Sequence, residues 1–353
     1  MIDTLTSLRF FAVVFIFLSH LGFFTQYENL KSIFNNCFYE GYFAVTFFFL
    51  LSGFVLCYNY YSKLNDISLE KIISFTKKRL AHVYPIHIIT FLISIPLLYK
   101  DILMYPLKNI FKAILNIMLL QSFIPKQSVY FSYNVVSWNL SSLLLFYILF
   151  PIILVLVKRI TKDGCGKLAL MYIFIFIIIE LVFASIFKSN SYSHWLLYIS
   201  PFIRLIDCTI GMLLSVIYFQ NKECKVNLYV INILELISLL ALAMALINFK
   251  YINQSYRYGI YYMPFLCFII YIYAFQKGVI SKGLKNRTLV YLGTISYSFY
   301  MIHKLVLKYV GHINLLKKYP ISMALMSFCI SLIAAQILYK YLEKPLRKKI
   351  NLN

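Results

Sequence analysis

The sequence has few charged residues, and few of these are acidic. Asp, Glu, Lys and Arg make up 13% of its 353 residues, and Asp and Glu together number only 12. Soluble domains carry about 25% charged residues. Because 61% of the residues are hydrophobic and 18% are aromatic, the chain is too apolar for a soluble domain, and we interpret it as a polytopic membrane protein.

The sequence also lacks the cysteine spacings of metal sites and disulfide frameworks. Its seven cysteines are scattered, with no CxxC pair and no Cys/His spacing of the zinc-binding kind. We therefore expect no metal and interpret the cysteines as packing residues. No internal repeat, low-complexity tract or soluble domain is visible, so residues 1–353 are expected to form a single integral-membrane domain.

The formal net charge of +22 reflects 34 Lys and Arg residues, which cluster in short segments between apolar runs. In a soluble protein such a charge could indicate a nucleic-acid partner. In a membrane protein, basic residues in short loops mark the cytoplasmic side. The charge therefore predicts topology, and no nucleic-acid partner is expected.

Apolar runs of about 20 residues, long enough to cross a bilayer, predict an all-α bundle of about ten transmembrane helices. The runs lie near residues 7–24, 41–60, 83–99, 135–157, 168–187, 194–217, 227–248, 258–276, 288–311 and 321–342. Counting a shorter run at 114–124 as a span would place the basic cluster after residue 157 outside the cell. We therefore expect a short re-entrant or interfacial helix near 110–124, with both termini in the cytoplasm.

The first apolar run carries two polar residues that an ordinary membrane anchor does not need. Arg9 and His20 are eleven positions apart, which places them about 20° apart around a helix and about 16 Å apart along it. A cation in hydrocarbon is costly, so such residues usually face a bundle interior or a wet cavity. A signal peptide is the weaker interpretation, because its charge precedes an uninterrupted apolar core.

Polar residues also lie within later runs. Ser296, Tyr300 and His303 share one helix face. Arg204 and Asp207 are three residues apart and can form an ion pair on one helix. A paired charge is the simpler structural interpretation of the second motif, and a lone histidine would most simply be a satisfied core residue. Because His20 and His303 both lie on polar helix faces of one bundle, a functional role is an equally open interpretation.

One motif lies within the second run and another follows it. Ser52 and Gly53 interrupt it with small side chains, for which a packing notch is the simpler interpretation. The basic segment Lys77-Lys78-Arg79 precedes the third run. Cations at this level suit anionic lipid headgroups or the phosphates of a cytosolic ligand.

Together these motifs resemble one family, the bacterial integral-membrane acyltransferases of type 3, which O-acylate surface polysaccharides and related acceptors. The resemblance covers nearly the whole chain and keeps the order of the motifs. The matching segments are Arg9–His20 (R-x10-H), Phe48–Phe54 (FFxLSGF), Arg79–Pro85 (a basic turn before proline), Ser137–Ser141 (SWSLS), Arg204–Gly211 (R-x-x-D-x-x-x-G), Ser296–His303 (SYxxYxxH) and Glu343–Arg347 (E-x-P-x-R).

The resemblance implies an enzyme of the bacterial cytoplasmic membrane that moves an acyl group, most often acetyl from cytosolic acetyl-CoA, to a hydroxyl of a cell-surface or lipid-linked polysaccharide. His20 would act as general base or carry the acyl group transiently. Arg9 would hold the donor's phosphates or stabilise an oxyanion.

The resemblance also implies a binding site for each substrate. The donor would be bound at the cytoplasmic mouth by Lys78, Arg79 and His82. The residues implied to line the cavity are Ser52, Trp138, Ser141, Tyr297 and His303. Membrane lipid and the sugar acceptor are the expected partners.

Two positions depart from the family's pattern. His82 stands where the family has a second arginine, and Leu143 stands where it has an acid after the SWSLS segment. Losing a carboxylate near a catalytic histidine removes an orienting partner. Two alternatives therefore remain open: a degenerate acyltransferase kept as a binding or assembly protein, and a transporter or flippase, since intramembrane ions also mark transport paths.

Overall fold

A computed structural model describes residues 2–188, 190–224, 226–313 and 318–346, and no β-strand occurs among them. Arg347, the last residue of the E-x-P-x-R motif, lies outside the described residues. The first eight α-helices are α1 (Asp3–Ser19), α2 (Glu28–Ile33), α3 (Tyr42–Tyr60), α4 (Leu69–Ser94), α5 (Tyr99–Met104), α6 (Pro106–Ile117), α7 (Gln127–Tyr130) and α8 (Trp138–Ile160). The remaining ones are α9 (Gly166–Phe187), α10 (Pro201–Asn221), α11 (Leu228–Asn248), α12 (Gln254–Arg257), α13 (Met263–Ala274), α14 (Val279–Leu284), α15 (Arg287–Thr294), α16 (Ser296–Gly311) and α17 (Pro320–Leu338).

Among the described residues, eight helical segments are long and apolar enough to cross a membrane, which confirms the predicted all-α polytopic bundle. The other two predicted spans differ from a plain helix. The run at 258–276 contains α13, which has only 12 residues. The run at 288–311 is divided at Ile295, whose ψ of 0° separates α15 from α16.

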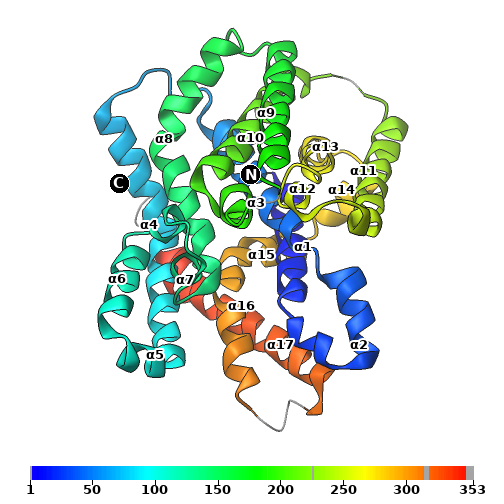
Figure 1. Ribbon diagram of the computed structural model, residues 1–353. Helices are drawn as coiled ribbons and strands as arrows, with labels where there is room; N and C mark the ends of the chain where they lie inside the picture. The colour runs from blue at the N-terminus through cyan, green and yellow to red at the C-terminus, as the bar shows by residue number, and fades with distance from the viewer. Residues whose placement is uncertain (1, 189, 225, 314–317, 347–353) are drawn as a thin grey trace.

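The helices α3 and α10 pack against each other in the middle of the bundle (Figure 1). A Cβ added to Gly53 would lie 1.8 Å from the carbonyl oxygen of Cys208, and one added to Gly211 would lie 2.0 Å from that of Leu50. The two helix backbones are therefore in contact, which small residues permit in membrane bundles. The packing interpretation of Gly53 is confirmed.

The predicted ion pair on α10 is also present and is fully buried. Arg204 Nη1 lies 2.6 Å from Asp207 Oδ2, and the two side chains are 1% and 0% exposed. The other terminal nitrogen of Arg204 donates to the carbonyl oxygen of Leu197 at 2.7 Å. These contacts compensate two charges that would otherwise be costly inside a membrane protein, so the pair has a structural explanation.

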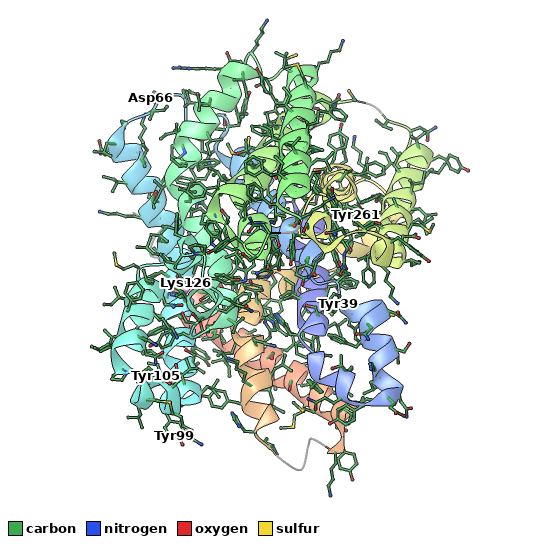
Figure 2. All side chains as sticks on the ribbon, in the orientation of Figure 1. Tyr39, Asp66, Tyr99, Tyr105, Lys126 and Tyr261 are labelled. Atoms are coloured by element: carbon green, nitrogen blue, oxygen red, sulfur yellow. The ribbon has the colours of Figure 1, made fainter. Side chains whose placement is uncertain are left out.

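The segment between α4 and α8 forms short helices at one end of the bundle (Figure 1). Tyr99 and Tyr105 lie at this end, whereas Asp66 lies at the opposite end (Figure 2). The helix α6 leaves the apolar side chains of Leu107 and Phe111 81% and 53% exposed. An amphipathic helix of this kind suits the membrane interface. It begins at Pro106, since proline favours the first helical position, and it ends at Ile117, before the end of the predicted range of 110–124.

Candidate active site

His20 lies immediately after α1 and caps that helix. Its backbone N–H donates to the carbonyl oxygens of Ile16 and Phe17 at 3.2 and 3.0 Å. The imidazole is half-buried, while Val13 and Ile16 on the face between Arg9 and His20 are buried. The face that carries the two polar residues is therefore turned toward the bundle interior.

The beginning of α1 is fixed by small polar side chains. The Thr4 hydroxyl donates to the carbonyl oxygen of Tyr273 at 2.6 Å, and the Ser7 hydroxyl donates to that of Leu284 at 2.5 Å. At Gly293 of α15 an added Cβ would lie 1.9 Å from the carbonyl oxygen of Thr6. α15 contacts the beginning of α1 at Thr6, and α16 contacts its end at His20. The close approach at Gly293 therefore fixes the position of α16 along α1.

His20 forms a hydrogen bond with His303 of α16. His20 Nδ1 and His303 Nε2 are 2.8 Å apart, and the two rings are stacked with centroids 5.0 Å apart at an angle of 17°. His303 Nδ1 lies 2.7 Å from the carbonyl oxygen of Tyr300 and 3.2 Å from that of Phe299. The structure thus brings together two predicted site residues that are 283 positions apart.

These contacts assign the protons of the neutral pair. A carbonyl oxygen only accepts, so His303 Nδ1 carries a hydrogen and its Nε2 is the acceptor. The hydrogen between the two rings must then belong to His20 Nδ1. As a result, His20 Nε2 presents a lone pair that can take a proton or attack a carbonyl carbon.

Aromatic side chains hold His303 in place. The Phe299 ring is stacked with the His303 ring at an angle of 4° and a centroid distance of 5.8 Å. Phe17 of α1 contacts both Phe299 and Phe328 edge-on. His303 is fully buried whereas His20 is partly accessible, so His20 is the member of the pair that a substrate can approach.

Arg9 and Arg79 converge on α8. Both guanidinium groups are near enough to the Tyr147 hydroxyl to interact with it electrostatically. Arg79 donates to the Tyr60 hydroxyl at 2.6 Å and stacks over the Phe75 ring at 5.3 Å. Cations from α1 and α4 therefore occupy one region, about three helical turns from His20.

Lys78 faces away from this region although it adjoins Arg79 in sequence. It is exposed and lines an open hollow of about 760 Å³ on α4. The other residues of the hollow are Leu69, Glu70, Ile73, Ser74, Lys77 and Ala81. His82 is half-buried on the same helix. The three predicted donor-binding residues are thus divided between an exposed face of α4 and its packed face.

Ser52 and Trp138 make packing contacts. The Ser52 hydroxyl donates to the carbonyl oxygen of Phe48 within α3 at 2.7 Å. Trp138 is only 4% exposed and packs on the rings of Phe49 and Tyr198 at 6.3 and 4.9 Å. Both residues therefore have a structural role in the core around α3.

Ser141 and Tyr297 hold neighbouring segments together. Ser141 donates to the carbonyl oxygen of Leu119 at 2.7 Å, which fixes the segment after α6 onto α8. Tyr297 donates to the carbonyl oxygen of Val83 at 2.7 Å, which fixes α16 onto α4. These hydrogen bonds position the elements around His303.

The position of the absent acid is apolar in the structure. Leu143 is half-buried and packs against the hydrophobic core. The acceptor for His20 Nδ1 in this structure is the imidazole of His303. Sequence reasoning identified His303 as a polar residue of the bundle interior but did not predict this pairing. Among the described residues, no three His, Cys, Asp or Glu side chains gather in a way that could hold a metal ion.

Comparisons with known proteins identify the family of this chain. The sequence profile of the acyltransferase domain of type 3 matches residues 2–340. The chain is similar to the acyltransferase MdmB of Streptomyces mycarofaciens, with 24% identity over 98% of this chain and 91% of the relative. It is also similar to the O-acetyltransferase OatA of Staphylococcus aureus, with 23% identity over 98% of this chain but only 57% of the relative.

No solved structure matches the chain. The profile match extends over nearly all of the chain and includes the segment from α1 to α17 in which the imidazole pair lies. The chain therefore belongs to the acyltransferase 3 family and is a membrane enzyme that transfers acyl groups.

Proposed function

We propose that this enzyme transfers an acetyl group from cytosolic acetyl-CoA to a hydroxyl of a cell-surface or lipid-linked polysaccharide. The observation that carries the proposal is the hydrogen-bonded pair of His20 and His303, which leaves His20 Nε2 with a lone pair. The name of the staphylococcal O-acetyltransferase supports acetyl as the acyl group and oxygen as the acceptor atom.

His20 serves as the general base in the proposed reaction. Its Nε2 takes the proton of the acceptor hydroxyl while that oxygen attacks the thioester carbonyl carbon. The C–S bond then breaks, and the imidazolium returns the proton to the leaving thiolate, so that the products are an O-acetyl ester and free CoA. His303 accepts from His20 Nδ1 throughout, which stabilises the positive charge that develops on His20.

Arg9 and Arg79 bind the phosphates of the donor in this scheme. The helical rise between Arg9 and His20 is about 16 Å, and an extended pantetheine arm has a similar length. Phosphates held near Arg9 would place the thioester beside His20. Arg79 adds a second cation near Arg9. The adenosine portion of the donor would extend around α4 to reach Lys78 on the exposed face of that helix.

The test is transfer of radiolabelled acetyl from acetyl-CoA to glycan acceptors by the full chain in lipid nanodiscs. His20→Ala is expected to lower acetyl transfer by at least about 100-fold, since a general base contributes 10²–10⁴-fold. His312→Ala is the matched control, because His312 is exposed beyond α16, and it should keep normal activity. Full activity in His20→Ala would remove His20 from the mechanism.

A further inference from the structure

Two lysines follow His303 on α16. Lys304 and Lys308 are one helical turn apart, so their side chains lie on the same stripe of the helix. Both are half-buried. The proposed reaction uses neither of them.

The stripe faces other parts of the protein. Tyr300 lies one turn before Lys304, and its hydroxyl donates to the carbonyl oxygen of Val136 at 3.0 Å. At the far end of the helix, Tyr309 donates to the carbonyl oxygen of Ile93 of α4 at 2.7 Å. These two hydrogen bonds hold α16, the helix that carries both lysines, against α4 and the segment that precedes α8.

Within the described part of the chain, neither ammonium group makes an ion pair or a hydrogen bond. Two carboxylates of the short segments that join the long helices have other partners. Glu40 pairs with Arg257, and Asp101 accepts from Asn109. Two like charges one turn apart repel each other, and partly buried charges normally require a partner.

Lys304 is also close to the catalytic pair. Its charge interacts electrostatically with both His20 and His303, and it interacts in turn with that of Lys308. An anion bound by the two lysines would lie beside the accessible ring of His20.

We propose that Lys304 and Lys308 bind an anionic group, a carboxylate or a phosphate, carried by the sugar acceptor. This inference rests on the proposed function and specifies its acceptor: the hydroxyl that reacts belongs to a negatively charged glycan. The two half-buried, like-charged side chains next to His20 carry the inference. Ammonium groups neutralise carboxylates and phosphates as point charges.

The experiment compares oligosaccharides of glucuronic acid with matched oligosaccharides of glucose. Acetyl transfer and donor-free equilibrium binding are both measured with the full chain in nanodiscs. The wild type should prefer the charged acceptor in kcat/KM and in binding. Lys304→Gln and Lys308→Gln should each reduce that preference roughly tenfold, the effect of losing one charge-assisted contact. Lys304→Arg keeps the positive charge and should restore most of the preference for the charged acceptor. Lys31→Gln on α2 is the matched control, because Lys31 is exposed, and it should leave the preference unchanged.

Each outcome has a distinct meaning. An equal preference of wild type and both glutamine variants would overturn the inference. Nanodiscs with and without phosphatidylglycerol test whether the lysines bind a lipid headgroup instead of the acceptor. If activity depends on this lipid, and both variants lose as much activity with neutral sugars as with charged ones, the lysines bind lipid. That result would also overturn the inference. Selective binding of the charged sugar without acetyl transfer would instead refute the proposed reaction and leave the anion site standing.

Discussion

His303 accepts the hydrogen bond from His20 Nδ1. In many catalytic dyads a carboxylate accepts this hydrogen bond from the histidine. A neutral imidazole is a weaker acceptor than a carboxylate, but its Nδ1–H is held by backbone carbonyl oxygens and its ring by Phe299. The resulting orientation of His20 does not depend on an ionised side chain in the membrane. The apolar Leu143 is therefore compatible with a functional base.

Replacing His303 tests this positioning role. His303→Leu is expected to reduce kcat for acetyl transfer about 100-fold, because His20 loses the acceptor that orients it and stabilises its charge. The KM for acetyl-CoA should change little, since in the proposed reaction the donor phosphates bind near Arg9, away from His303. Steady-state kinetics on the purified enzyme separate the two parameters.

The amide oxygen of a glutamine can accept from His20 Nδ1, so His303→Gln should retain more activity than His303→Leu. An equal loss of kcat in both variants together with a lower thermal midpoint would show that His303 is needed for folding instead.

Leu143→Glu should bring no gain in kcat, because His303 already accepts from His20. A clear gain in kcat would mean that His20 needs a carboxylate.

At the scale of helices, the contact between α3 and α10 shows how small residues decide packing. Gly53 and Gly211 each face a backbone carbonyl oxygen at a distance that leaves no room for a methyl group. The sequence predicted this for Gly53 because a glycine in an apolar run permits close approach. It did not identify the partner helix, since hydropathy is equally high where a helix meets lipid and where it meets protein.

A larger side chain at the contact between α3 and α10 should lower the stability of the bundle. Gly211→Ala is expected to destabilise the protein by about 1–3 kcal/mol, the usual cost of overpacking, and to lower the thermal midpoint in detergent. The control is Gly283→Ala, because no heavy atom lies within 4 Å of the added Cβ at that position. Equal midpoints in the two variants would show that α3 and α10 can move apart without cost.

For the whole molecule, hydropathy predicted the bundle and most of its spans. Two of the runs do not form one long helix: the run at 258–276 contains the 12-residue α13, and the run at 288–311 is divided. The predicted span at 288–311 becomes two helices separated at Ile295, and its second half carries Lys304 and Lys308. Charged residues of this kind lower the apolar signal of a run, and hydropathy does not tell which distant parts of the chain pack beside them. The pairing of His20 with His303 was unpredictable for the same reason.

The proposed orientation of the bundle can be tested with native cysteines. Cys37 and Cys224 are both free and exposed, and the distribution of basic residues places them on opposite sides of the membrane. A membrane-impermeant maleimide should label Cys37 in intact cells and Cys224 only after permeabilisation. Cys37→Ser and Cys224→Ser identify the labelled site by mass spectrometry, and the reverse pattern would mean that both termini are extracytoplasmic.

The anchoring of α1 has a consequence for the register of the catalytic pair. The helix is held at one end by Thr4, Ser7 and the contact at Gly293, and it carries His20 at the other. One residue more or fewer between these points would turn His20 by about 100° and shift it by about 1.5 Å, which breaks its hydrogen bond to His303. The number of residues from Ser7 to His20 therefore determines whether the two imidazoles of the proposed active site can meet.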